Sequence, residues 1–156
     1  MTSSIRGGCE LTVEIDNSSG DSVDIKALQA QAEFLIAALS LHPECELSIA
    51  IVDVERMTEL HVEWMDEPGP TDVLSFPMDE LIEGEVEPGV LGDIVLCPAV
   101  VADQAQTAGH SVQAEYELLL THGMLHLLGH DHADEEEHRV MFARQDQLLA
   151  AWRESR

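Results

Sequence analysis

Three histidines in the last third of the sequence are spaced as ligands of one metal ion. They lie in the stretch Thr121–His132, which reads THGMLHLLGHDH. His122 and His126 are four residues apart, so on a helix they project from the same face, one turn from each other. Gly129 predicts the end of that helix, because glycine enters the left-handed conformation without a steric penalty. The chain can then fold back and bring His132 to the same point.

These three histidines suit a catalytic zinc site. Three neutral imidazoles leave one position of a tetrahedral Zn²⁺ open for water, whereas four protein ligands close a structural site. A histidine pair at this helical spacing would on its own more often be a partly buried polar face. The third histidine and the glycine favour the metal. We therefore predict one Zn²⁺ per chain, held by His122, His126 and His132, with metal-bound water as the reactive group.

The expected general base of a zinc peptidase is missing. The stretch has the HxxxHxxGxxH ligand spacing of the metzincin peptidases, which carry a glutamate directly after the first histidine. Gly123 stands at that position here, and glycine can neither accept nor return a proton. A zincin-type metallopeptidase is therefore the less favoured interpretation. No catalytic residue is assigned for proton transfer; Asp131 is a candidate, and we favour for it a role in orienting a ligand imidazole.

The chain is strongly acidic. Its 156 residues include 31 Asp and Glu against 7 Lys and Arg, a formal net charge of −24 at pH 7. This balance opposes non-specific attraction to nucleic acid, because phosphate binding depends on lysine and arginine. The simplest interpretation is a solvated surface adapted to solubility or salt. Action on a nucleic acid would then depend on the metal, on a protein partner, or on a cluster of Arg56, Arg139 and Arg144.

Length and cysteine usage favour one domain in a reducing compartment. We predict a single domain over residues 1–156, with residues 1–9 frayed. Cys9, Cys45 and Cys97 are odd in number and not closely spaced, which argues against a disulfide framework. No stretch approaches the roughly 20 apolar residues of a membrane helix, and the first residues lack the apolar run of a signal peptide. We expect a cytoplasmic protein without a membrane segment.

The elements that position the histidines follow from hydrophobic periodicity and capping residues. Strands are predicted over residues 10–16, 46–53, 71–77 and 91–97. Helices are predicted over residues 24–40, 98–108 and 111–128, with others beginning at Asp53 and near Asp134. This order predicts an α/β (α+β) fold, with a mixed sheet of about four strands packed with helices and the metal-site helix near the C-terminus.

Two further segments have an expected role. Met57, Leu60, His61 and Trp64 share one side of the helix that begins at Asp53, and we interpret them as core packing. Residues 78–90 carry five acidic residues and no basic one, and we interpret them as a mobile hairpin tip.

Three motifs together resemble a known family. They are THGMLHLLGHDH, PTDVLSFPMDEL at residues 70–81 and LGDIVLCP at residues 91–98. In this order they resemble the YbeY family, bacterial metal-dependent endoribonucleases of ribosomal RNA maturation and ribosome quality control. The resemblance spans roughly residues 46–150. It implies a zincin-like domain with zinc on His122, His126 and His132, and residues 71–76 as the strand beside the metal cleft. It also implies ribosomal RNA and the small ribosomal subunit as partners, reached through a ribosomal protein or an assembly GTPase.

The sequence departs from the family pattern at two positions. Met65 stands where many members have an arginine that is considered important for activity. His130 replaces the tyrosine before the Asp-His pair, and we interpret it as a solvated turn residue rather than a fourth ligand. The alternative to an endoribonuclease is therefore a non-catalytic ribosome assembly factor with a structural metal.

Overall fold

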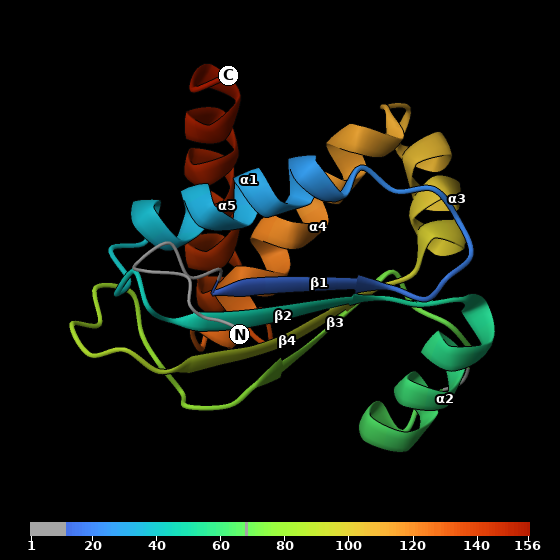
Figure 1. The fold of residues 1–156 in the computed structure, drawn as a ribbon, viewed down its shortest axis with the longest axis horizontal. Helices are drawn as coiled ribbons and strands as arrows, with labels where there is room; N and C mark the ends of the chain where they lie inside the picture. Colours follow the sequence, from blue (N-terminus) through green and yellow to red (C-terminus); the bar gives the residue numbers. More distant parts are fainter. Residues whose placement is uncertain (1–11, 68) are drawn as a thin grey trace, which may run out of the picture.

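The computed structural model describes residues 12–67 and 69–156. Four strands in these residues form one mixed sheet in the order β1-β2-β4-β3 (Figure 1). β1, β2 and β4 are parallel, and β3 pairs with β4 in the antiparallel direction at the edge. The strands are β1 (Val13–Asn17), β2 (Glu46–Ile51), β3 (Val73–Pro77) and β4 (Val90–Leu96).

Five helices connect and cover the strands in the described ranges, and polar side chains start most of them. The carboxylates of Asp24, Asp53 and Asp134 and the hydroxyl of Ser111 accept hydrogen bonds from backbone N–H groups in the first turn of the next helix. These four residues stand where the sequence predicted the four helices to begin. The helices are α1 (Ile25–Ala38), α2 (Val54–Met65), α3 (Pro98–Ala108), α4 (Val112–Leu127) and α5 (Glu135–Glu154).

The sheet buries its two faces against different helices. α1 and α4 pack on one face, with α5 behind them, and α2 lies on the other side at the end of the sheet (Figure 1). Neighbouring side chains along β4 point to opposite faces of the sheet. Ile94 belongs to the large core under α1 and α4, whereas Val95 and the following Cys97 belong to the smaller core under α2. The metal-site helix α4 is therefore held between the sheet and three other helices, α1, α3 and α5.

The apolar side of α2 is only partly buried, which corrects one prediction. Met57 is fully buried in the smaller core, but Trp64 is 62% exposed. The cause is the position of α2 at the end of the sheet, where its first turns cover β-strand residues and its last turn projects beyond them. The interpretation of Trp64 as a core residue was therefore wrong.

The acidic loop between β3 and β4 is tied to the body of the protein. Leu81 is buried in the large core, and the backbone N–H of Gly84 donates to the carbonyl of Leu39 at 3.0 Å. Glu83 accepts a hydrogen bond from Arg144 on α5 at 2.8 Å. The strands on either side do form the expected hairpin, but these three contacts hold its connection against α1 and α5.

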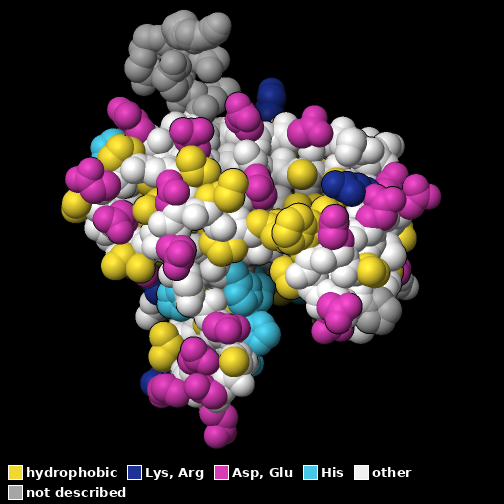
Figure 2. All heavy atoms as spheres, turned by 90° about the horizontal axis from the view of Figure 1, so that it is seen from below, with side chains coloured by type: hydrophobic (Ala, Val, Ile, Leu, Met, Phe, Trp, Pro, Cys, Tyr) yellow, Lys and Arg dark blue, Asp and Glu magenta, His cyan; other side chains and the backbone are white. Residues whose placement is uncertain are grey.

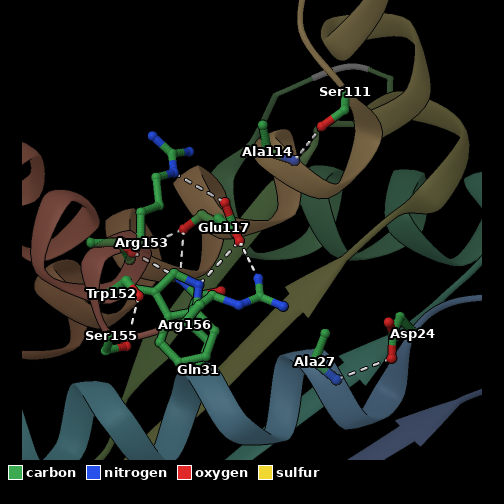
Figure 3. A network of polar contacts seen from close by, with 11 residues as sticks. Asp24, Ala27, Gln31, Ser111, Ala114, Glu117, Trp152, Arg153, Ser155 and Arg156 are labelled. Carbon is green, nitrogen blue, oxygen red and sulfur yellow. Dashed lines mark hydrogen bonds and ion pairs between the residues drawn. The ribbon is translucent and has the colours of Figure 1, made fainter.

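A buried carboxylate links α4 to the end of α5 (Figure 3). Glu117 is 5% exposed, and its oxygens accept hydrogen bonds from the indole N–H of Trp152 and from Arg153 and Arg156, at 3.0–3.2 Å. Its carbonyl also accepts from the side chain of Gln31 on α1, at 2.9 Å. A buried charge needs such partners, because an unpaired one is very costly. The three helices are thus joined one turn before the first metal-site histidine.

The predicted fold class is confirmed. Every predicted strand and helix is present, with boundaries that differ by a few residues. The predicted fraying of residues 1–9, and the first residues of the predicted strand 10–16, lie outside the described residues. In the described ranges, no helix combines the length and the apolar character needed to cross a membrane.

Candidate metal centre

A Schellman motif ends helix α4 and starts the turn to His132. Gly129 adopts a left-handed conformation with φ of 92°. Its N–H donates to the carbonyl of His126, and the N–H of His130 donates to the carbonyl of Leu125, each at 3.0 Å. This pair of bonds satisfies the last carbonyls of a helix while the chain reverses. Nothing lies within 4 Å of a Cβ built at Gly129, so there is room for a larger side chain. Glycine is favoured here because of the left-handed backbone conformation and not because of crowding.

The structure brings the three predicted histidines together. The Nε2 atoms of His122 and His126 lie 3.1 Å apart. One ring nitrogen from each of these residues and from His132 lies within 4.8 Å of the others, so the group could hold one metal ion. Two nitrogens bound to a tetrahedral Zn²⁺ at about 2.0–2.1 Å would be about 3.3 Å apart. The spacing found between His122 and His126 is close to that value, whereas His132 lies on an exposed turn.

Hydrogen bonds at the opposite ring nitrogens fix the tautomers of two histidines. The Nδ1 atom of His122 lies 2.8 Å from Oε1 of Gln145, and Nδ1 of His126 lies 2.9 Å from the carbonyl oxygen of His130. Both partners can only accept, so both Nδ1 atoms carry the proton. The two Nε2 atoms are then unprotonated, and their lone pairs point toward each other. Two acceptors this close repel each other unless a cation lies between them, so the arrangement fits a metal.

Burial keeps these two imidazoles neutral. Loss of solvent lowers the pKa of both His122 and His126 below the ordinary value of 6.5. For His122 the hydrogen bond that its Nδ1 donates to Gln145 and the charge of Asp72 both raise the pKa, but each has a smaller effect than burial. Neutral imidazole is the form that binds a metal, so the environment favours ligation over protonation.

The sequence reasoning missed Gln145. It is 3% exposed on α5, in the same apolar stripe as Met141 and Leu148. A buried polar residue in such a stripe needs a hydrogen-bond partner, and that requirement is the signal that could have identified it. His130, expected as a turn residue, also contributes to the site through its backbone carbonyl.

Asp131 contacts the backbone in this structure. Its carboxylate accepts from the backbone N–H of His132 at 2.7 Å, and the carboxylate of Asp72 accepts from the N–H of Val73 at 2.8 Å. Both aspartates line the cleft in front of the histidines. A role for Asp131 in orienting an imidazole stays a prediction. The cleft is also lined by Met65, Val73, Leu74, Ser75, Pro77, Gly129 and His130.

Gly123 lies where helix α4 packs against strands β3 and β4. A Cβ at this position would be 3.1 Å from Oγ of Ser75 and 3.2 Å from Cδ1 of Ile94. The hydroxyl of Ser75 also donates to the carbonyl of Gly123 at 3.2 Å. A larger residue such as glutamate would press on these two side chains and force them to shift. The position that carries the base in zinc peptidases is therefore packed against strands β3 and β4.

The cleft has no cationic side chain among its described lining residues. Figure 2 shows histidines in a hollow of this face, with many carboxylates and few basic groups around it. Each arginine in the described ranges is paired with a glutamate, so carboxylates offset the charges of Arg56, Arg139 and Arg144, the three residues considered from the sequence. The pairs are Arg56–Glu59, Arg139–Glu136, Arg144–Glu83, Arg153–Glu117 and Arg156–Glu117.

These features define a class of protein: an α/β domain in which a helix, a glycine turn and three histidines form a candidate zincin-like metal site. The family model described as Endoribonuclease YbeY matches residues 14–153. The chain is 55% identical over 149 residues to Endoribonuclease YbeY of Thermobifida fusca, covering 93% of this chain and 96% of the relative. It is 56% identical over 154 residues to Endoribonuclease YbeY of Acidothermus cellulolyticus, covering 94% of each.

A solved structure has the same fold. The solution structure of TM1509 from Thermotoga maritima matches with a TM-score of 0.62 and 25% identity, covering 92% of this chain and 93% of that chain. The matches in sequence and fold agree over nearly the whole chain. The chain belongs to the endoribonuclease YbeY family, and the family predicted from the three motifs is confirmed.

Proposed function

We propose that this protein is a zinc-dependent endoribonuclease that hydrolyses phosphodiester bonds of ribosomal RNA. The main support for a metal site is that the Nε2 atoms of His122 and His126 face each other at 3.1 Å. The Nδ1 atoms of both residues donate hydrogen bonds to the protein, so each Nε2 is left to bind a metal. Zinc bound there would lower the pKa of a water to about 7 and polarise a phosphoryl oxygen. The names of the relatives support the reaction class.

Other residues of the chain orient the ligands and line the cleft. Gln145 and the carbonyl of His130 orient two imidazoles, and the Schellman turn at Gly129 presents His132. The carboxylates of Asp72 and Asp131 line the same cleft and are the candidates for holding a proton. Gly123 argues against the peptidase alternative, because glycine carries no base and a larger side chain there would press on Ser75 and Ile94.

A non-catalytic assembly factor is the second candidate. The observation in its favour is the absence of a lysine or arginine among the described residues of the cleft, where Met65 stands in place of the family arginine. Without a fixed positive charge beside the scissile phosphate, the developing charge of the reaction is less well stabilised. Under this alternative the ion would only hold the helix and turn together.

The setting of the reaction is part of the proposal. With a net charge of −24 and its described arginines paired to glutamates, the protein is poorly suited to capture naked RNA by itself. We therefore place it in the cytoplasm on the small ribosomal subunit, recruited by a ribosomal protein or an assembly GTPase.

Cleavage of ribosomal RNA under single-turnover conditions tests the proposal. Zinc-loaded protein should cut the RNA, and His126→Ala should lose both the zinc and the cleavage. Purified small subunits should be cut faster than free RNA. A zinc-loaded, folded protein that leaves both substrates intact would favour the assembly-factor alternative. The chemical ends of the products would separate attack by water from attack by the 2′-hydroxyl of the RNA.

A further inference from the structure

Strand β3 lines the metal cleft with the open edge of the sheet. It is the last strand in the order β1-β2-β4-β3, so it is paired only with β4. Four of its five residues line the cleft, namely Val73, Leu74, Ser75 and Pro77. The open side of an edge strand presents backbone N–H and carbonyl groups that are free to bind another molecule. These groups therefore contribute to what the cleft can hold.

The register of β3 on β4 shows which backbone groups face outward. In an antiparallel pair, alternate residues direct both their N–H and their carbonyl to the neighbouring strand. The carbonyl of Asp72 accepts from the N–H of Cys97 at 3.3 Å. The N–H of Met78 donates to the carbonyl of Leu91 at 3.1 Å. The even-numbered positions of β3 are thus directed toward β4. The odd-numbered positions are directed outward, and these are Val73, Ser75 and Pro77.

One of these three residues has an N–H available to a ligand. Proline has no N–H, which removes Pro77. The N–H of Val73 donates to the carboxylate of Asp72 at 2.8 Å. The register gives the N–H of Ser75 no acceptor on β4, and no hydrogen bond from it to another group is found in the described part of the chain. Within β3, all of which the structure describes, Ser75 thus has the available outward donor.

Ser75 is fixed beside the first metal-site histidine. Its hydroxyl donates to the carbonyl of Gly123 at 3.2 Å, and Gly123 directly follows His122 on α4. The side chain is thereby engaged with the helix, and the N–H is left on the open edge. Because this bond joins the strand to the helix, the donor keeps its position relative to the histidines. A donor that needs no reorientation is effective in stabilising charge that develops in a reaction.

The charge of the cleft gives this donor a specific use. The described lining residues include the carboxylates of Asp72 and Asp131 and no lysine or arginine. Attack on a phosphodiester, by water or by a 2′-hydroxyl, increases the negative charge on its non-bridging oxygens. A metal can bind one of these oxygens, and the other needs a separate donor. Backbone N–H groups serve proteins both as phosphate ligands and as donors to developing charge.

We propose that the backbone N–H of Ser75 donates a hydrogen bond to a non-bridging oxygen of the phosphodiester held at the histidines and stabilises the charge that develops there. The inference rests on the proposed function and deepens it, because it names a catalytic group that acts where the cleft has no cation among its described residues. The hydroxyl of Ser75 serves only to anchor the strand to α4. No bond to Ser75 forms or breaks, and its proton stays on the nitrogen.

NMR spectroscopy tests the contact without any reaction. Zinc-loaded, isotope-labelled protein is titrated with dimethyl phosphate, a phosphodiester that has no base and no 2′-hydroxyl. A hydrogen bond to phosphate moves an amide proton downfield, so the Ser75 signal should move in that direction. The Val73 signal is the internal control and should move less, because its N–H already has a carboxylate acceptor. A Ser75 signal that stays in place would overturn the inference.

Replacing the N–H by an ester oxygen gives the second test. Cell-free translation with a suppressor tRNA can place the α-hydroxy analogue of serine at position 75, which keeps the side chain and removes the donor. The kcat for RNA cleavage should fall about 10²–10³-fold, the typical cost of one such donor, with unchanged zinc content. KM should change less, because the bond strengthens in the transition state. Ser75→Ala keeps the N–H and should lose much less of the rate.

An ester at Ile15 is the matched control. This residue lies on β1, the strand at the opposite edge of the sheet. Thr12 and Ser18 are bonded to β2, so by the same alternation the N–H of Ile15 faces outward. An ester there also removes an outward N–H and weakens the preceding carbonyl as an acceptor, but it does so far from the cleft. Its kcat should equal that of the wild type.

The outcomes separate this inference from the proposed function. If the ester at Ser75 cuts RNA as fast as the wild type, the inference is refuted and the nuclease stands. If dimethyl phosphate moves the Ser75 signal but the wild type cuts no RNA, the phosphate contact is supported and the nuclease is refuted. If the signal stays in place and no RNA is cut, both fail.

Discussion

Gln145 accepts a hydrogen bond from Nδ1 of His122 at 2.8 Å, across 23 residues of sequence. The glutamine is buried on α5, and the histidine lies on α4. Because this bond sets the tautomer, it decides which nitrogen of His122 can bind a metal. The last helix is therefore part of the metal site although it contributes no ligand.

Loss of this acceptor should weaken zinc binding. Gln145→Leu has a similar size but no hydrogen-bonding group, and we expect the zinc affinity to fall about 10- to 100-fold, the usual cost of removing a partner of a ligand imidazole. Gln145→Glu keeps an acceptor and should retain or increase the affinity. Competition with a fluorescent chelator measures both. Gln147→Leu on the same helix is the control, and equal affinities for the two leucine variants would contradict the assigned role.

Zinc occupancy should persist below the usual histidine range as the pH falls. The pKa values of His122 and His126 lie below 6.5 in the folded protein because burial disfavours the charged form. Between pH 6.5 and those lower values the two rings are still neutral, so protons compete poorly with the metal. Elemental analysis after equilibration at falling pH measures the occupancy. Complete loss of zinc by about pH 6.5 would contradict this prediction.

The same shifts predict how the stability of the metal-free protein depends on pH. In the unfolded chain these histidines have ordinary pKa values, so they take up protons at a higher pH than in the folded state. Unfolding then binds protons, and the free energy of unfolding decreases as the pH falls below about 6.5. Urea unfolding at several pH values measures this slope. Replacement of both histidines by glutamine should reduce it.

Enlarging residue 123 should destabilise the fold without creating a peptidase. A Cβ there would lie 3.2 Å from Cδ1 of Ile94, so Gly123→Ala should lower the free energy of unfolding by about 1–3 kcal/mol. Ile94→Val removes that methyl group, and the double variant should lose less than the sum of the two single changes. Gly123→Glu should be less stable still and should not cleave casein. If the losses of unfolding free energy in the two single variants add up in the double variant, the contact with Ile94 is not the cause of the destabilisation.

Met65→Arg should speed RNA cleavage without a change in zinc content. Met65 lines the cleft, so an arginine there could place a forked set of donors on a phosphate. The gain should be at most about 10²–10³-fold, the typical effect of one such contact. Arg56 cannot replace it, because it is paired with Glu59 and lies nine residues earlier, about 13 Å along α2. Arg56→Ala should therefore leave the rate unchanged. A folded Met65→Arg protein with wild-type turnover would contradict the prediction.

Binding of RNA to the isolated protein should depend weakly on salt. Few counterions are released when few cations contact phosphate, so the plot of log K against log salt should be shallow. Titration of a fluorescent oligoribonucleotide at several salt concentrations gives the slope. Tight binding with a steep slope would mean that the arginines leave their glutamate partners and contact the RNA.

The sequence was most informative where the physical cause was local. The histidine spacing, the turn at Gly129 and the caps at Asp53 and Ser111 depend on neighbouring residues, and the structure has each of them. The family and the fold class were also predicted correctly.

What could not be predicted depends on tertiary packing. Gln145 reaches His122 only because α5 crosses α4, and Gly123 is required only because β3 lies against that helix. The exposure of Trp64 follows from where α2 extends beyond the sheet, which its apolar periodicity does not reveal. A periodic pattern shows which side of a helix is apolar but not how far the surface that covers it extends.

The division of the three histidines between a rigid helix and an exposed turn has a consequence for the kinetics of metal exchange. The hydrogen bonds that orient His122 and His126 come from the protein and not from the ion, so the helix would offer an incoming ion a half-site with two ligands. His132 can then close the site with little rearrangement of the body. Dissociation would begin by the reverse step, with the turn after Gly129 opening first. The lifetime of the bound ion would thus be set by the stiffness of a few turn residues, while the helix sets where the ion binds.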